Sequence, residues 1–185
     1  MPQQWKLSNV VILKKGEDRD PSNPKSYRPI CLLNVLGKIE EKLLIQRLNT
    51  SRIAIRMNGD QFGFRKHKST EDALNRAIDL VKASTSKYMI GIFVDISGAF
   101  DNLWWPALFA RLREVGCPDN LYHTFRDYCR ERIVTAKCPG EDISKITTKG
   151  CSQGSICGPV FWDVAMEPCL YELQAMQEVE GVVAY

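Results

Sequence analysis

A carboxylate at the end of an apolar run is the residue of this chain best placed to do chemistry. The run Tyr88–Val94 has the composition of a buried strand and is followed at once by Asp95, then by small residues and an aromatic. Hard divalent ions such as Mg²⁺ take oxygen ligands, commonly one or two carboxylates together with substrate phosphates. We therefore predict a strand over residues 88–94 that presents Asp95 as a metal ligand; taken alone, such an aspartate more often forms a turn or caps a helix.

A glycine-rich loop further along the chain is a second candidate. Gly150, Gly154 and Gly158 surround Gln153 just before an apolar helical pattern. Glycine lets the backbone approach a ligand closely, so the loop is a possible ligand-binding element. The alternative is an ordinary turn that leads into a helix.

Basic residues stand beside two apolar runs near the N-terminus. Lys14 and Lys15 follow the run Leu7–Leu13, and Arg28 precedes the run Ile30–Leu33. An arginine offers a fork for bidentate phosphate bonding, and a lysine offers a mobile point charge. These positions are therefore candidate phosphate contacts.

In this order, the blocks resemble the reverse transcriptases of non-LTR (LINE-type, type-1) retrotransposable elements, most closely those of arthropod elements that insert into ribosomal RNA genes. The resemblance rests on Tyr27–Ile30, Gly37–Lys42, Gln61–Lys66, Ile92–Asp101 and Lys149–Pro159. It implies an RNA-directed DNA polymerase that adds dNTPs to the 3′-OH of a DNA primer on an RNA template. The reaction would use two divalent ions, Mg²⁺ or Mn²⁺.

The resemblance also assigns roles to single residues. Asp95, with the backbone carbonyl of Ile96, would hold the metal, and Asp95 would be the catalytic carboxylate. The dNTP contacts would be Lys14, Arg28, Phe100, Gln153 and Gly154, and the nucleic-acid contacts would be Arg65 and Lys66.

Several of these assignments have open alternatives. Lys15 could exchange roles with Lys14, and Arg65 with Lys66 could form a solvated basic loop. Phe100 would exclude a 2′-hydroxyl, but without the resemblance it would be an ordinary core residue. Asp101 is better explained as a cap on the following turn.

Two residues of the glycine-rich loop, Ser152 and Cys151, bear on its conformation and chemistry. Many relatives carry proline where this chain has Ser152, and its loss removes a fixed φ from the loop. Cys151, beside it, is expected to be structural, because no histidine is identified as its base.

The order of the elements indicates an α+β protein, and the resemblance implies the right-hand polymerase fold. Residues 1–87 would be mainly fingers and residues 88–185 a partial palm, with no thumb. In the family, a pair of aspartates follows the position of Ala184-Tyr185, and the present sequence ends there. We therefore expect this chain alone not to polymerise, with Asp163 and Glu167 serving only as surface or helix-end charges.

Two other functions stay open at this point. The chain could be a non-catalytic genomic relic that at most binds nucleic acid through its basic first part. A weaker alternative is a group II intron maturase or an RNA-dependent RNA polymerase, and Phe100 argues against ribonucleotide use. An endonuclease domain often accompanies such polymerases in one polyprotein.

Periodicity and turn signals predict the elements. The expected strands are Leu7–Leu13, Ile30–Leu33, Tyr88–Val94, Ile133–Lys137, Ile143–Thr148 and Val179–Tyr185. The expected helices have as apolar faces Val35, Leu36, Ile39, Leu43, Leu44 and Leu48; Ala73, Leu74, Ala77, Ile78 and Val81; Leu108, Leu112 and Val115; and Val160, Phe161, Val164, Met166 and Leu170. A further short helix is expected over 118–128, and Pro168 should kink the last one.

Composition limits the class of protein. The 185 residues carry a net charge of +3, but residues 1–70 hold 14 Lys and Arg against 6 Asp and Glu, and residues 71–185 hold 11 against 16. A basic part beside an acidic one suits a polymerase, although a solvated basic face would look the same. No apolar run approaches the ~20 residues that cross a bilayer. Seven cysteines without a CxxC pair, with only two histidines, argue against a zinc site and indicate reduced thiols in an intracellular protein. The resemblance implies a nuclear location, where target-site reverse transcription would take place.

Overall fold

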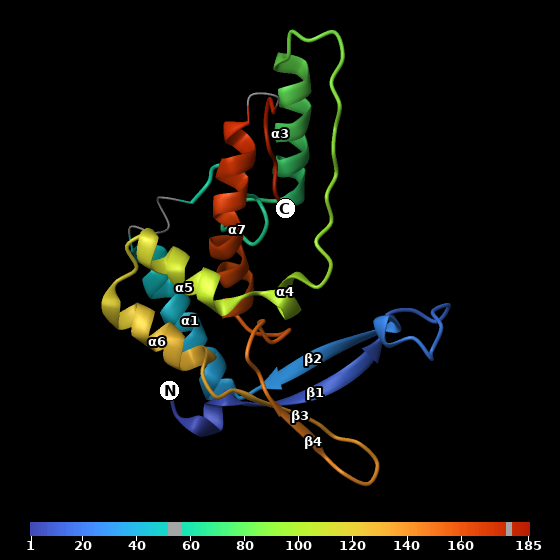
Figure 1. Ribbon diagram of the computed structural model, residues 1–185, viewed down its shortest axis with the longest axis vertical. Helices are drawn as coiled ribbons and strands as arrows, with labels where there is room; N and C mark the ends of the chain where they lie inside the picture. The colour runs from blue at the N-terminus through green and yellow to red at the C-terminus, as the bar shows by residue number, and fades with distance from the viewer. Residues whose placement is uncertain (52–56, 177–178) are drawn as a thin grey trace.

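The computed structural model describes residues 1–51, 57–176 and 179–185, which form a four-stranded sheet beside a helical body (Figure 1). Strands β1 (Leu7–Lys14) and β2 (Tyr27–Leu33) make an antiparallel hairpin. Strand β3 (Ile133–Ala136) pairs parallel with β1 and antiparallel with β4 (Ile143–Ile146), so the order is β2-β1-β3-β4. These four predicted strands are confirmed, and the sheet joins two distant parts of the chain.

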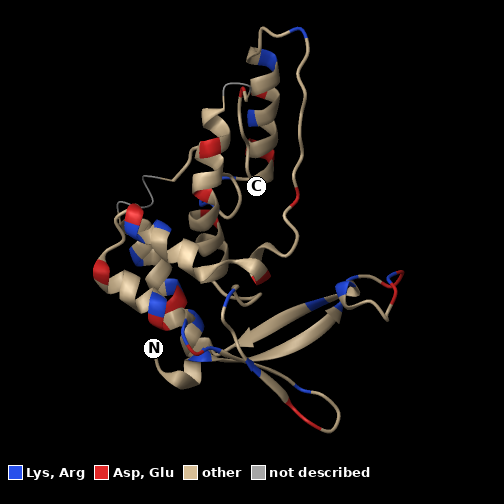
Figure 2. Ribbon diagram, in the orientation of Figure 1, with Lys and Arg blue, Asp and Glu red and all other residues tan. Residues whose placement is uncertain are grey.

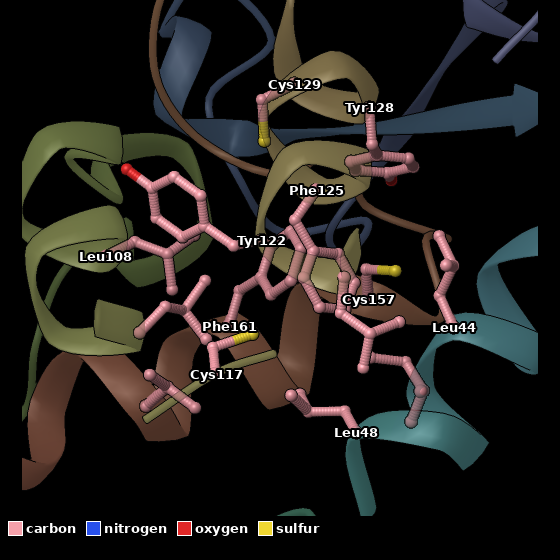
Figure 3. Packing of buried hydrophobic residues seen from close by; sticks show 14 of the residues in the cluster. Leu44, Leu48, Leu108, Cys117, Tyr122, Phe125, Tyr128, Cys129, Cys157 and Phe161 are labelled. Carbon is pink, nitrogen blue, oxygen red and sulfur yellow. The ribbon is translucent and has the colours of Figure 1, made fainter. Parts of the chain in front are cut away.

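The hydrophobic core lies among four helices. They are α1 (Val35–Thr50), α5 (Trp105–Glu114), α6 (Asp119–Cys129) and α7 (Cys157–Ala175). Phe125 of α6 and Phe161 of α7 are fully buried and meet edge to face, with ring centroids 5.1 Å apart (Figure 3). This contact adds specific aromatic geometry to a large apolar burial.

Local sequence signals explain where these helices begin and end. The side chain of Asn34 accepts a hydrogen bond from the Leu36 amide and so caps α1. After α5, Gly116 adopts a φ of 77°, and the Cys117 amide bonds back to the Leu112 carbonyl at 2.8 Å. This is the Schellman arrangement that a glycine permits, and it confirms the predicted end of the helix at Gly116.

Four further elements of the described residues are the 3₁₀ turns η1 (Gln3–Lys6) and η2 (Pro24–Ser26), helix α3 (Thr70–Ala83) and the short helix α4 (Ala99–Asn102). The start of α3 is the predicted capping box. The Ser69 side chain accepts from the Asp72 amide, and the Asp72 carboxylate accepts from the Ser69 amide at 2.8 Å.

The predicted apolar faces of α1 and α3 are only partly buried. On α1, Leu44 and Leu48 enter the core, but an exposed stripe consists of Val35, Leu36, Ile39 and Leu43. On α3, Ala73 is buried, and the exposed apolar side chains are Leu74, Ile78 and Val81. Periodicity marks an apolar stripe, but burial needs a second element over it, and the described part of the chain places none there.

The predicted strand over 88–94 is wrong. Residues 84–96 run as an extended segment beside α3, away from the sheet (Figure 1). Phe93 is 98% exposed and Ile90 is 89% exposed. A strand needs a ladder partner, and none of residues 1–51, 57–176 or 179–185 pairs with this segment.

The strand expected over Val179–Tyr185 is reduced to one bridge. Ala184 pairs in parallel with Gln61, and its amide donates to the Asp60 carbonyl at 3.0 Å. None of the described helices is both long enough and apolar enough to cross a membrane. The mixed α/β architecture agrees with the expected class, while the fingers and palm boundaries stay a prediction.

Candidate active site

The glycine-rich loop, defined here as residues 149–156, is fastened to α4 through the backbone. The Cys151 amide donates to the Phe100 carbonyl at 2.7 Å, and the Gly150 amide donates to the Leu103 carbonyl at 2.8 Å. Gly150 has a φ of +79°, and a Cβ there would lie 2.7 Å from the Asp101 carbonyl oxygen. The approach therefore requires glycine at this position.

The same loop is also bonded to β2. The Cys31 amide donates to the Gln153 carbonyl at 2.9 Å. Gly154 has a φ of +113°, and a Cβ there would lie 2.8 Å from the Cys31 carbonyl oxygen. The loop consequently holds Gln153 and Gly154 against the strand that carries Arg28.

A buried carboxylate fixes the far end of the loop. Glu41 of α1 is 1% exposed and accepts hydrogen bonds from the Tyr128 hydroxyl at 2.7 Å, the Ser155 hydroxyl at 3.2 Å and the Ile156 amide at 2.6 Å. Sequence analysis missed this role. The available signal was its spacing, because Glu41 lies on the same helical face as Leu44 and Leu48.

Phe100 and Gln153 lie at the junction of α4 and the loop. The Phe100 ring is half-buried, 5.7 Å from the Phe64 ring and 6.4 Å from the Trp162 ring. The Gln153 amide donates to an Asp101 carboxylate oxygen at 3.4 Å. Asp101 makes no helix-capping hydrogen bond in the described residues, so its expected role as a cap is wrong.

A cavity of about 200 Å³ lies between the loop, α4 and the sheet, and Pro29, Cys31, Asp101, Arg132 and Gln153 are among its lining residues. Arg132 is 5% exposed, lies over the Tyr128 ring at 4.3 Å and donates to the Tyr128 carbonyl at 3.3 Å. No carboxylate of the described residues is within ion-pair distance of it. Sequence analysis did not single it out, because nothing in its local pattern distinguishes it from a surface arginine.

The cysteine beside the loop is not activated. Burial raises the pKa of the Cys151 thiol to about 12, against a smaller opposing effect of the Arg132 charge. A protonated thiol is a weak nucleophile. This agrees with the structural role expected for Cys151.

The basic candidates on the hairpin lie beside the loop that connects β1 to β2. Arg28 on β2 is exposed. The Lys14 ammonium donates to the Glu17 carbonyl at 2.8 Å, and the Lys15 ammonium donates to the Lys25 carbonyl at 3.1 Å. Each lysine has a comparable local bond, so the choice between them stays a prediction.

The next basic pair, Arg65 and Lys66, differs in burial. Lys66 is exposed, whereas Arg65 is half-buried and one of its terminal nitrogens, Nη1, is buried without a partner in the described residues. The Arg65 charge opposes the effect of burial on Asp163, whose pKa is nonetheless raised to about 7. The two residues therefore do not form one solvated basic surface.

The acidic residues of α7 were assigned wrongly to the surface. Asp163 is 3% exposed and accepts from the Gln61 side chain at 3.1 Å. Glu167 is 2% exposed and accepts from the Asn58 amide at 2.8 Å and from Arg111 at 3.0 Å. Both carboxylates connect α7 to other parts of the chain rather than facing water.

The proposed metal ligand is separate from this assembly. Asp95 is exposed at the end of the extended segment, and the neighbouring Ile96 is 45% exposed. Within the described ranges, no three His, Cys, Asp or Glu residues form a group that could hold a metal ion. The structure brings together Phe100, Gln153 and Gly154 and leaves Asp95 outside.

Comparison with known proteins identifies the family of this chain. The sequence pattern of the reverse transcriptase (RNA-dependent DNA polymerase) family matches residues 12–185. The chain belongs to the reverse transcriptase family.

Similar proteins place this reverse transcriptase chain among those of non-LTR elements, as expected. It is 40% identical, over 94% of its length, to a putative 115 kDa protein in a type-1 retrotransposable element of Drosophila melanogaster. It is equally similar, with the same coverage, to the retrovirus-related Pol polyprotein from a type-1 retrotransposable element of Bradysia coprophila. It is 33% identical, over 88% of its length, to the RNA-directed DNA polymerase from mobile element jockey of Drosophila melanogaster. The chain spans only 17%, 17% and 18% of these relatives.

Proposed function

We propose that this reverse transcriptase chain binds the incoming deoxynucleoside triphosphate where β2, α4 and the glycine-rich loop meet. It would do so as part of an RNA-directed DNA polymerase that extends a DNA primer on an RNA template. One observation carries the proposal: backbone bonds hold Phe100, Gln153 and Gly154 at one junction, against the strand of Arg28. Its place of action would be the nucleus.

The residues at the junction suit the parts of a dNTP. Arg28 is exposed and presents a guanidinium that can bond two phosphate oxygens. Gln153 can exchange its long bond to Asp101 for a bond to the sugar, because a 3.4 Å contact is a weak one. The Phe100 ring would leave no room for a 2′-hydroxyl, so that selection works by exclusion.

The divalent ions of the proposed reaction need more donors than the junction offers. Mg²⁺ or Mn²⁺ would activate the primer oxygen and bind the triphosphate. Asp95, with the Ile96 carbonyl, is our candidate ligand, but the described residues contain no group of three or more His, Cys, Asp or Glu side chains that could hold a metal ion. The donor set therefore does not fit a two-metal centre, and the role of this chain that we derive is binding and sugar selection.

Nuclear magnetic resonance of the labelled chain tests this binding role. Titration with dTTP should shift the amide signals of Gln153, Gly154 and Phe100, and UTP at the same concentration should shift them less. In Phe100→Val, the two nucleotides should become similar. Shifts confined to other elements, or an unchanged preference for dTTP in the variant, would contradict the proposed site.

A second function, nucleic-acid binding without polymerisation, is favoured by the donor set. With Asp95 alone, we expect no Mg²⁺-dependent extension of an oligo(dT) primer on poly(rA) by this chain. Binding of the same template should persist at low salt and weaken steeply as salt rises, because counterion release needs no active site. Extension that EDTA abolishes would show that the donor set is sufficient after all.

A further inference from the structure

The outer faces of α5 and α6 form a groove of about 870 Å³ that the proposed nucleotide site does not use. Its polar lining includes Arg113, His123, Arg126 and Arg130, with Tyr122 between the two helices. We name it the α5–α6 groove. Four basic or imidazole side chains in one concave surface favour an anionic ligand.

Two of the arginines are held in place without an acidic partner. The Arg113 guanidinium, from α5, and the Arg126 guanidinium, from α6, lie 4.6 Å and 6.0 Å from the centre of the Tyr122 ring. Both side chains are exposed, and no carboxylate within the described ranges forms an ion pair with either. Stacking on an aromatic ring orders a guanidinium and leaves its N–H groups free to bond an anion.

The acidic residues near the groove do not cancel this charge. Asp127 accepts a hydrogen bond from the buried Lys6 ammonium at 2.9 Å, which lowers the pKa of that carboxyl and neutralises it locally. Glu131 pairs with Arg130 at 3.1 Å, but both side chains are largely exposed, so the pair is weak. Arg113 and Arg126 therefore dominate the electrostatics of the groove.

The groove is next to the candidate active site. Trp105 and Cys129 line both the α5–α6 groove and the cavity beside the glycine-rich loop, and Thr147 and Thr148 line one each. A nucleic-acid strand bound in the groove could therefore approach the proposed nucleotide site directly. An acidic protein segment would also suit the arginines, but its binding would not explain why the groove lies beside the nucleotide site.

We propose that the α5–α6 groove binds the phosphodiester backbone of single-stranded RNA, with Arg113 and Arg126 as its two principal contacts. This surface is on different elements from Arg65 and Lys66. The inference rests on the proposed function only in choosing RNA over other polyanions. It requires neither catalysis nor a metal ion.

The salt dependence of RNA binding tests the groove. Affinity of the 185-residue chain for fluorescent oligo(A) RNA is measured by anisotropy over a range of salt concentrations. R113Q/R126Q should bind about tenfold more weakly, and its slope of log affinity against log salt should fall by about 1.4, or ~0.7 for each lost phosphate contact on a single strand. The matched control K82Q/K87Q removes two exposed positive charges at and beyond the end of α3 and should retain the wild-type slope.

Two further measurements separate the possible outcomes. R113K/R126K keeps both charges and should restore most of the slope, which loss of folding would not allow. If the groove variant and the control bind alike while the chain still binds RNA, the groove proposal fails and the proposed function survives. If the wild-type chain binds no RNA, the groove proposal and the nucleic-acid-binding function both fail, and the dNTP site is judged by the dTTP titration alone. Competition by polyglutamate as strong as competition by unlabelled RNA would indicate an acidic protein partner and overturn the choice of RNA.

Discussion

The glycine-rich loop and the extended segment 84–96 differ in how the rest of the chain holds them. Both carry residues that we predict at the active site from the resemblance, and both contain glycine beside apolar residues. The loop is bonded to β2, to α4 and to Glu41 of α1. In the segment, Ser84 and Ser86 donate to Glu180, but residues 87–95 are exposed and make no backbone hydrogen bond to another part of the chain that the structure describes.

The extended segment is also poor in charged residues. Figure 2 shows few charged residues along the extended segment between α3 and α4. In the sequence, Asp95 stands near the C-terminal end of this segment. Apolar composition alone did not give this segment a position, because a strand is stabilised by its neighbours on both sides. Backbone hydrogen bonds therefore pre-organise the proposed nucleotide half of the site, and the proposed carboxylate half, at Asp95, has no such bonds in the described residues.

The largest change in the free energy of unfolding should come from replacing Glu41. Its replacement by alanine removes an acceptor of the Tyr128 and Ser155 hydroxyls and of the Ile156 amide. The two hydroxyls can still bond to each other, so one hydroxyl and the amide lose their acceptor, and each unsatisfied group costs about 1–3 kcal/mol. We expect Glu41→Ala to lower the free energy of unfolding by about 3–5 kcal/mol in urea denaturation. Lys42→Ala, at an exposed neighbour on the same helix, is the control and should change it by less than about 0.5 kcal/mol. Equal losses in the two variants would remove Glu41 as the anchor.

Asp163 should make stability depend on pH in the opposite sense to an ordinary aspartate. Burial raises its folded pKa to about 7, above the ordinary value of 3.8. Between those values the folded state keeps a proton that the unfolded state has lost, so stability falls as pH rises from about 4 to about 7. Asp163→Asn keeps an oxygen for Gln61 but cannot ionise. The difference in free energy of unfolding between this variant and the wild type should therefore be about 2–3 kcal/mol more favourable to the variant at pH 8 than at pH 4. A variant with the wild-type pH dependence would show that another group titrates.

Gly154→Ala should loosen the loop from β2. The new Cβ would lie 2.8 Å from the Cys31 carbonyl oxygen at a φ that alanine rarely adopts, which costs about 1–2 kcal/mol. Gly16→Ala, where a Cβ meets nothing within 4 Å, should be neutral. Thermal denaturation of the pair measures the difference, and indistinguishable transitions would mean that the loop does not need this close approach.

The smallest effect should come from Asp95. Since it is exposed, Asp95→Asn should change the free energy of unfolding by less than about 0.5 kcal/mol. Chemical denaturation with the same protocol measures this. A decrease of more than about 1 kcal/mol in the free energy of unfolding would reveal a structural contact of Asp95, and the extended segment would then be held by contacts as the loop is.

Local rules predicted the parts of the fold that depend on neighbours in sequence. The β1–β2 hairpin, the Ser69–Asp72 capping box and the end of α5 at Gly116 all followed from short-range signals. The buried carboxylates did not, because Glu41 and Glu167 acquire their partners from residues more than fifty positions away. Motif resemblance named Phe100, Gln153 and Gly154, and no local pattern indicated that backbone bonds would bring them together.

The extended segment shows why a strand prediction from composition can be wrong. The run before Asp95 has the composition of a strand, but composition does not provide the partner that makes one. For the same reason the stripes on α1 and α3 were correct as patterns and wrong as buried faces.

Amide hydrogen exchange, followed residue by residue with nuclear magnetic resonance, tests the central contrast most directly. The amides of Cys31, Gly150, Cys151 and Ile156 donate the bonds that hold the glycine-rich loop, and they should exchange at least about a hundredfold more slowly than unprotected amides. The amides of residues 89–95 should exchange at nearly unprotected rates. Protection of residues 89–95 equal to that of the loop would contradict the account, because the carboxylate half of the site would then be as firmly held as the nucleotide half.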